Sequence, residues 1–157
     1  MSTITSPIIS APRIEGTPSG SGLPTVTLKK GSGTGTNYTT TSTSYVDVDT
    51  TNLAYSVVIP VGWKLTITVR ATLENSAAIS TVGVALADGA TVINEARTRC
   101  ESTGGRYPIA LLWAITGAGA THNIRLQFRV FAAVTGTIHN VSASELPTML
   151  FVLMPSN

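Results

Sequence analysis

Charged side chains are scarce in this sequence. Asp, Glu, Lys and Arg make up 11% of its 157 residues, less than half of the roughly 25% that is usual for a soluble domain. Instead, 25 Thr and 15 Ser supply most of the polar side chains. Ten basic and eight acidic residues form no basic cluster, which argues against a nucleic-acid-binding surface. Low charge with ample apolar content also argues against a disordered chain.

Cysteine and long apolar runs are equally rare. Cys100 is the single cysteine, so the chain can form no internal disulfide, and we expect a small buried side chain rather than a nucleophile. The longest apolar run, residues 149–154, is as long as a strand and too short for a membrane span. The first ten residues contain no Lys, no Arg and no apolar run, so they lack the features of an export signal. We therefore expect synthesis in the cytoplasm and no membrane partner.

Motifs for catalysis or metal binding are also missing. His122 and His139 show no metal-binding spacing, so we expect them on the surface or in turns. Asp47 and Asp49 lie on one side of an extended segment and could bind a hard cation, but a turn in the Asp-Thr-Thr-Asn stretch explains them better. The glycines of residues 31–35 lack the strand and helix that flank a phosphate loop. We expect no cofactor, no metal and no enzymatic activity.

The first 36 residues differ in composition from the rest. Proline stands at positions 7, 12, 18 and 24, a spacing that prevents both helix and central strand, and a glycine-rich stretch follows. Large aliphatic side chains are nevertheless present, and their exposure to water is unfavourable by roughly 1.5–3 kcal/mol each. We expect residues 1–36 to be an extended arm and hinge, and residues 37–157 to be one domain. The arm residues expected to contact a partner are Ile4, Ile8, Ile9, Arg13, Ile14 and Leu23.

From residue 38 onward, apolar and polar residues alternate with the period of a β-strand. Residues 63–71 are the clearest case, with five apolar side chains on one face and Lys, Thr and Arg on the other. Pro60-Val61-Gly62 is a turn signal, and Asp88-Gly89 is the signal of a two-residue hairpin. No segment has the pattern of a helix. We therefore predict eight to ten strands arranged as a sandwich or a barrel.

Two segments, residues 109–115 and 149–154, are apolar on both faces. A strand of a two-sheet sandwich turns only one face to the core, so the other face needs a second cover. The arm or a neighbouring copy of the domain could provide it, and we favour a neighbouring copy. The residues predicted at this contact are Trp113, Leu150, Val152, Leu153 and Met154.

Arginines mark a second candidate surface. They could form bidentate pairs with carboxylates of another protein, or they could be solvated and pair locally with Glu95 and Glu101. The pattern alone leaves both alternatives open. The arginines concerned are Arg97, Arg99, Arg106, Arg125 and Arg129.

Several phrases of the sequence are distinctive. They are Ser42-Thr-Ser-Tyr-Val-Asp-Val48, Ile59-Pro-Val-Gly-Trp-Lys-Leu65, Val84-Ala-Leu-Ala-Asp-Gly89, Gly136-Thr-Ile-His-Asn-Val-Ser142 and Leu150-Phe-Val-Leu-Met154. In these residues the chain resembles bacteriophage virion proteins with a trimeric, tumour-necrosis-factor-like jelly-roll head. The resemblance implies an all-β fold, an antiparallel jelly-roll β-sandwich, and a homotrimer with its last strand near the threefold axis. The long aliphatic arm resembles that of a capsid decoration (cement) protein.

These expectations combine in a structural virion protein. The homotrimer would sit on the outer capsid surface, bind the major capsid protein through its arm, and stabilise the capsid because it binds only the assembled lattice. The alternative is a tail or head-fibre tip that binds a host receptor or carbohydrate. Its candidate stacking side chains are Tyr45, Tyr55, Trp63, Tyr107 and Trp113, although core burial is favoured for Trp63.

Overall fold

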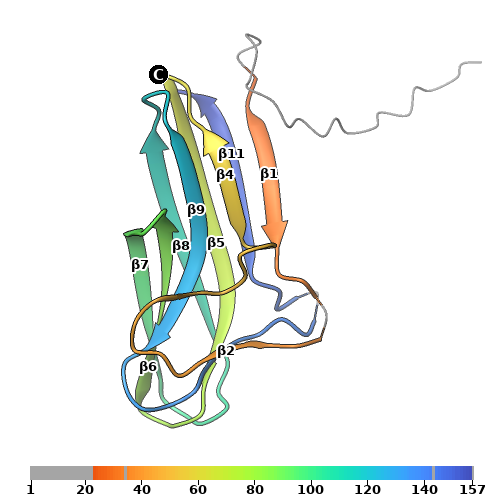
Figure 1. The fold of residues 1–157 in the computed structure, drawn as a ribbon. Coiled ribbons are helices and arrows are strands. Elements are labelled where there is room, and N and C mark those ends of the chain that lie inside the picture. The colour runs from red at the N-terminus through yellow and green to blue at the C-terminus, as the bar shows by residue number, and fades with distance from the viewer. Residues whose placement is uncertain (1–22, 34, 143, 157) are drawn as a thin grey trace, which may run out of the picture.

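Strands make up the regular structure of this chain. The computed structural model describes residues 23–33, 35–142 and 144–156, and within them it contains strands but no helix, hence none that could cross a membrane (Figure 1). The strands are β1 (Thr25–Lys30), β2 (Tyr38–Thr40), β3 (Val46–Asp47), β4 (Ala54–Val58), β5 (Trp63–Asn75), β6 (Ser80–Asp88), β7 (Thr91–Cys100), β8 (Tyr107–Thr116), β9 (Thr121–Val130), β10 (Gly136–Ile138) and β11 (Thr148–Pro155).

Two antiparallel sheets pack face to face. Sheet A has the order β1-β11-β5-β8, with β10 continuing the line of β11 along β5 and β2 pairing with β10. Sheet B has the order β4-β9-β6-β7, with β3 also pairing with β9. The chain crosses between the sheets after β2, β4, β5, β7, β8 and β9. Two antiparallel sheets of six and five strands, connected in this way, form a jelly-roll sandwich, so the predicted fold class is confirmed.

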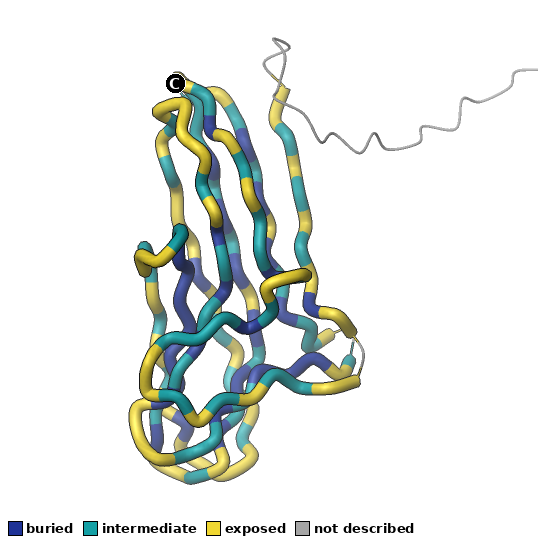
Figure 2. The backbone as a smooth tube through the Cα atoms, viewed as in Figure 1, coloured by how far each residue is buried: buried dark blue, intermediate teal, exposed yellow. Residues whose placement is uncertain are grey.

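The core lies between the two sheets. In β5, Leu65, Ile67 and Val69 are fully buried while the residues between them turn to the outer side, and the same alternation occurs along β9 and β11 (Figure 2). The ring of Phe151 lies 4.7 Å from that of Tyr55 within this core. Cys100 is buried as expected, and burial, with the carboxylates of Glu101 and Glu74 adding to it, raises the pKa of its thiol.

Two predicted turns are present. Asp88 lies opposite Thr91 at the β6–β7 hairpin, and Gly89 has a φ of 57°, the left-handed conformation that glycine favours. In the turn at residues 60–62, the amide of Trp63 donates to the carbonyl oxygen of Pro60 at 3.1 Å, and Gly62 has a φ of 77°. This second turn takes the chain from sheet B to sheet A.

The sandwich begins earlier than expected. We predicted an arm and hinge through residue 36, but β1 pairs with β11 from Thr25, opposite Leu153, to Lys30, opposite Thr148 (Figure 1). Residues 25–30 contain no proline, and β1 lies at the edge of its sheet, where Pro24 just before it removes no ladder hydrogen bond. Residues 25–30, which we expected in the arm and hinge, thus form a strand of sheet A.

The glycine-rich stretch that we expected to be a hinge is held by hydrogen bonds at Gly31 and Gly33. The amide of Gly31 donates to the carbonyl oxygen of Pro147 at 2.9 Å, and that of Gly33 donates to Oδ1 of Asn140 at 3.3 Å. A Cβ at residue 31 would lie 2.3 Å from the same Asn140 oxygen, so only glycine allows this approach. Of the predicted arm contacts, Leu23 is exposed. Ile4, Ile8, Ile9, Arg13 and Ile14 lie outside the described residues.

Candidate functional site

The outer face of sheet A presents apolar side chains to solvent. Directly opposite residues of antiparallel strands point to the same side, so the register defines rows across β1, β11, β5 and β8. One row is Leu28, Leu150, Thr68 and Leu112, and the next is Val26, Val152, Thr66 and Ala114. We call the six apolar members the A face: Val26, Leu28, Leu112, Ala114, Leu150 and Val152.

Most side chains of the A face are exposed to solvent. Leu112 is 66% and Val26 is 61% exposed, and Leu28 and Leu150 are also exposed. Its members come from β1, β8 and β11, and the threonines of β5 lie between those of β8 and those of β11. Contiguous exposed apolar residues of this kind mark interaction surfaces.

Cations flank the A face. Lys30, Thr148, Arg70 and Ala110 form the row beyond Leu28, and Lys64 lies opposite Met154 at the other end. Within the described part of the chain, Lys30, Lys64 and Arg70 have no hydrogen bond, ion pair or ring contact. The A face is thus apolar at its centre and positive at its ends.

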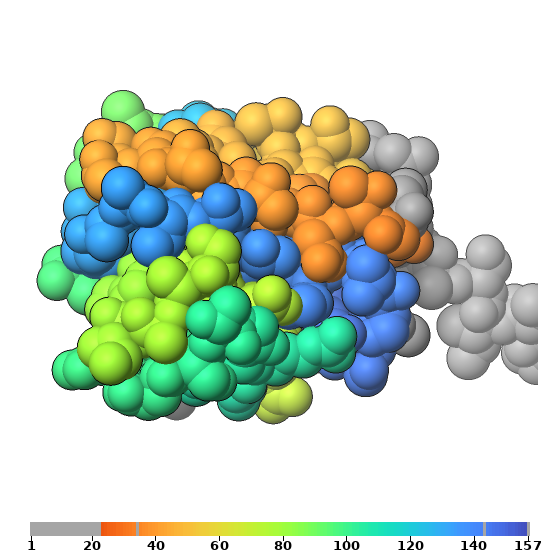
Figure 3. Space-filling model, turned by 90° about the horizontal axis from the view of Figure 1, so that it is seen from below, coloured from red at the N-terminus to blue at the C-terminus, as the bar shows by residue number. Residues whose placement is uncertain are grey.

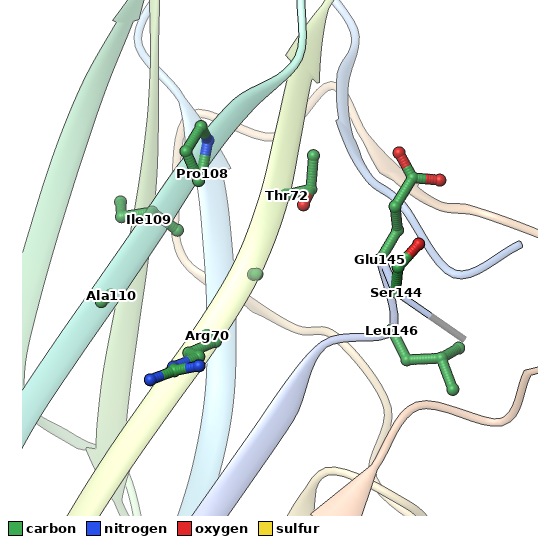
Figure 4. Close-up of a pocket in the computed structure, with 9 residues that line it drawn as sticks. Arg70, Thr72, Pro108, Ile109, Ala110, Ser144, Glu145 and Leu146 are labelled. Carbon is green, nitrogen blue, oxygen red and sulfur yellow. The ribbon is translucent and has the colours of Figure 1, made fainter. Parts of the chain in front are cut away.

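A hollow of about 340 Å³ opens at the Arg70 end of this face. Figure 4 shows Arg70 and Thr72 on β5, residues 108–110 on the neighbouring β8, and residues 144–146 on the segment that leads to β11. Glu145, at its rim, pairs with Arg106 and accepts a hydrogen bond from Ser142 Oγ at 3.0 Å. The remaining lining of the hollow is mostly apolar, with Pro108, Ile109, Ala110 and Leu146.

The predicted contact residues divide between the two sides of sheet A. Leu150 and Val152 belong to the A face, and half-buried Met154 lies beside it. Leu153 does not, because it lies opposite Leu65 and is only 5% exposed, inside the protomer's own core. Trp113 lies opposite Ile67 on the core-facing side and is 39% exposed because β8 is an edge strand.

Sequence reasoning missed the β1 contribution to the A face. Val26 and Leu28 were assigned to the arm and hinge, although Thr and apolar residues alternate between Pro24 and Gly31. That short alternation was the available signal. Leu112 and Ala114 lie in a segment that was correctly identified as apolar on both faces.

The five candidate arginines all have partners within the chain. Nε of Arg97 donates to Glu95 at 2.8 Å, and Nε of Arg99 lies 3.2 Å from Glu101, so the alternative of local pairs is what these two adopt. The other three pairs are Arg106 with Glu145, Arg125 with Asp47, and Arg129 with Glu95. Each of the five arginines is thus paired with a carboxylate of its own chain.

Two aromatic rings cover a glycine on the outer side of sheet B. A Cβ at Gly83 would lie 2.9 Å from the ring of Phe131 and 3.1 Å from the hydroxyl of Tyr45. The guanidinium of Arg129 lies 4.3 Å from the Phe131 ring centre and 4.5 Å from that of Tyr45. The Tyr45 hydroxyl donates to Glu95 at 2.6 Å, and burial together with this carboxylate raises the pKa of Tyr45 to about 12.

The aromatic side chains of the carbohydrate-binding alternative are mostly engaged inside the chain. Tyr55 packs on Phe151, and Tyr107 accepts hydrogen bonds from the amides of Glu101 and Ser102 at 2.8 and 3.0 Å. Trp63 packs against the core, as expected. Of the five candidates, Trp113 is the one with an exposed side chain.

Both histidines are paired with carboxylates. His139 is buried, 3% exposed, with Nε2 2.8 Å from Glu74, so its expected surface position was wrong. The amide of His139, just after β10, donates to the carbonyl oxygen of Thr72 at 2.9 Å. In the view from below in Figure 3, the blue segment around β10 lies beside the yellow-green end of β5, with which β10 pairs. Half-buried His122 has Nδ1 2.6 Å from Asp88. The described residues contain no cluster of three His, Cys, Asp or Glu that could hold a metal.

Asp49 closes a turn, as the preferred interpretation of the two aspartates predicted. Its carboxylate accepts hydrogen bonds from the amides of Thr51 and Asn52 at 2.9 and 2.8 Å and from the hydroxyl of Tyr38 at 2.6 Å. Burial alone would raise the pKa of Asp49, but these hydrogen bonds outweigh it and lower the pKa. Asp47 instead binds Arg125 and Gln127.

Asp49→Asn is expected to lower the free energy of unfolding at pH 7 by about 1–2 kcal/mol, because hydrogen bonds to a charged acceptor are lost. The folded pKa of Asp49 lies below its ordinary value of 3.8, so this stability is present above that value and is lost as the pH falls through the folded pKa. Urea unfolding of both proteins should show a difference that shrinks between about pH 5 and pH 2. A difference independent of pH would contradict the role of the charged carboxylate.

Comparisons with protein families and with curated proteins find no match. Among solved structures, the chain is similar to infectious bursal virus T=1 particles at 13% identity and a TM-score of 0.46, covering 97% of this chain and 40% of that one. It is also similar to the VP2 subviral particle of infectious bursal disease virus, with 12% identity and a TM-score of 0.44. That match covers 85% of this chain and 38% of the VP2 chain. A third similar structure is the insecticidal delta-endotoxin Cry8Ea1 from Bacillus thuringiensis, with 13% identity and a TM-score of 0.42. The match covers 77% of this chain and 20% of the endotoxin chain.

The chain therefore spans only 20% to 40% of the length of these three proteins. These likenesses are too remote to indicate a shared function.

Proposed function

We propose that this chain is a non-enzymatic structural protein of a virion and that its A face is buried against other copies of the chain. The observation that carries the proposal is the set of six apolar side chains of β1, β11 and β8, which lie in register on either side of the threonines of β5. Their removal from water is favourable by roughly 25 cal/mol per Å². Self-association is the simplest way to bury such a surface on a chain with so little charge.

The cations beside the A face favour a ring over a face-to-face dimer. In a twofold contact the same patch meets itself, which would bring Lys30, Arg70 and Lys64 of both copies into one interface. In a cyclic trimer the A face meets a different surface of the next copy, and like charges need not meet. A homotrimer is accordingly the oligomer proposed.

In its finer form, the proposal is a bacteriophage capsid decoration protein on the outer capsid surface, with the major capsid protein as its partner. Its support is the sequence resemblance, the scarcity of charge and the aliphatic residues that precede β1. A decoration protein that binds only the assembled capsid lattice would stabilise that lattice by mass action. Three linked arms would raise the effective concentration of each.

Deleting residues 1–22 is expected to leave a folded oligomer that no longer binds virus particles. The deletion stops before β1, so the jelly roll stays whole, while loss of the arms should weaken binding roughly 100-fold or more. Co-sedimentation with particles of the encoding phage that lack the protein measures binding, and circular dichroism checks the fold. Undiminished binding of the shortened chain would overturn the arm as the capsid contact.

A further inference from the structure

The end of the sandwich opposite the start of β1 carries an exposed apolar surface (Figure 1). Two loops build it, residues 76–79 after β5 and residues 131–135 after β9, and Figure 3 shows this end of the molecule from below. The amide of Ser76 donates to the carbonyl oxygen of Thr135 at 2.9 Å, and the amide of Thr135 donates to Oγ of Ser76 at 2.9 Å. We call the exposed apolar residues of these joined loops the tip: Ala78, Ile79, Phe131, Ala132 and Ala133.

Ile79 is the unusual residue of the tip. Its φ of 57° lies in the left-handed region, which a β-branched residue rarely adopts, and it is 66% exposed. The buried side chain of Asn75 holds this loop, because Nδ2 donates to Oγ of Ser80 and Oδ1 accepts from the amide of Ala77 at 3.4 Å. Residues held in such conformations cluster at contacts with ligands. An exposed isoleucine gains nothing from the folding of its own chain, so this one is suited to a partner.

The hollow on the outer side of sheet A has the shape and lining to receive such a side chain. Its volume of about 340 Å³ is more than twice the roughly 150 Å³ of a cavity that binds benzene, and its lining is mostly apolar. Arg70, which lines it, has no partner within the described part of the chain. Arg70 follows Thr68 by two residues on the same side of β5, so the hollow continues the A face.

A carboxylate beside the tip matches the charge of Arg70. The ladder of β6 and β7 ends at residues 80 and 100, so Ile79 and Glu101 leave it as neighbours. The side chain of Glu101 is 65% exposed and lies 3.2 Å from Nε of Arg99. An exposed pair of this kind contributes little to stability, and a carboxylate can accept several hydrogen bonds. Glu101 can therefore bind a second arginine without giving up Arg99.

We propose that the tip of one copy docks on sheet A of the next, with Ile79 in the hollow and Glu101 beside Arg70. This inference rests on the proposed function, because it names the surface of the next copy that continues the contact of the A face. No residue of the tip lines the hollow of its own chain, so the two patches meet between copies. They are different patches, as a contact that closes into a ring requires.

Ile79→Gly is expected to weaken association while leaving the fold intact. Glycine adopts the left-handed conformation readily, so the urea midpoint of the dissociated protomer should not fall. The dissociation constant of the oligomer, measured by sedimentation equilibrium, should rise about tenfold because an aliphatic contact is lost. Val61→Gly is the matched control, since Val61 is equally apolar and exposed but lies in the turn before β5, at the other end of the sandwich. Unchanged association in Ile79→Gly would overturn the docking of this side chain.

A charge swap tests the ion pair between copies. Arg70→Glu and Glu101→Arg should each weaken association about tenfold, because each brings like charges together. The chain that carries both substitutions should regain most of the lost affinity, since the pair is restored with its signs exchanged. A double variant as weak as the single variants would contradict the pairing.

Cross-linking of two single-cysteine chains identifies the patches directly. In a Cys100→Ser background, we expect Ile79→Cys chains mixed with Ala110→Cys chains to be joined by a short bis-maleimide, because Ala110 is exposed and lines the hollow. Val61→Cys in place of Ile79→Cys is the control and should give no link. If aspartate in the A face breaks the oligomer but the expected link is missing, this docking is wrong while the A face remains the interface. A chain that does not associate at all would overturn both proposals.

Discussion

Replacing both Leu112 and Leu150 by aspartate is expected to convert the oligomer into a folded monomer. The two side chains stand on either side of Thr68 in one row of the A face, and both are exposed in the isolated protomer. In the monomer the new carboxylates are therefore hydrated. In an interface each would be an unpaired buried charge, which costs about 3–5 kcal/mol, so together they should weaken association by roughly 1000-fold or more.

Light scattering after size-exclusion chromatography measures this change, and circular dichroism checks the fold. The matched control is the pair Val61→Asp and Val92→Asp, two exposed apolar residues in the β4–β5 turn and on β7 of sheet B, away from the A face. It introduces the same charge and should leave the oligomer intact. An oligomer that survives aspartate at both leucines would refute the A face as the interface. Leu153→Asp cannot serve here, because Leu153 is in the core and its replacement should unfold the protomer.

Phe151→Ala is expected to remove about 3–5 kcal/mol from the free energy of unfolding, the usual cost of emptying a large aromatic site. Phe151 is fully buried, lies opposite Ile67, and packs against the ring of Tyr55. Since domains of this size are stable by about 5–15 kcal/mol in total, the loss is a large fraction of the stability. Urea unfolding at low protein concentration measures it.

Val152→Ala is the matched control for the buried phenylalanine. Val152 is the next residue of the same strand but faces outward in the A face, so its truncation should cost the protomer less than about 1 kcal/mol. Both substitutions are best compared in the Leu112→Asp, Leu150→Asp background, where association no longer contributes. Equal losses from the two would mean that the assignment of sides in β11 is wrong.

The structural features that could be predicted from the sequence are those that depend on residues close together in the chain. Alternation in residues 63–71 gave the buried side of β5, and Asp88-Gly89 gave the hairpin, because period-two patterns and turn preferences are local. The same reasoning gave burial for Cys100 and a turn for Asp49.

Features that depend on strand register or on residues far apart in the chain could not be predicted from the sequence. When both faces of a strand are apolar, the pattern cannot tell that Leu153 and Trp113 face inward while Leu150 faces outward; pairing with Leu65 and Ile67 decides this. The edge strand β1 was hidden because prolines and glycines around it dominate the local composition. Likewise, the burial of His139 follows from a chain segment that closes over Glu74 from far along the sequence.

The pairing of β1 with β11 also has a consequence for when the protein can assemble. β11 fills the place between β1 and β5, so sheet A stays incomplete until residues 148–155 have emerged from the ribosome. Contacts between such distant parts of a chain form late and slowly. Until then Leu28 and Leu112 are not held in one surface, and the nascent chain lacks a complete A face. If the chain self-associates through the A face as proposed, this topology delays the association until residues 148–155 have been synthesised and paired.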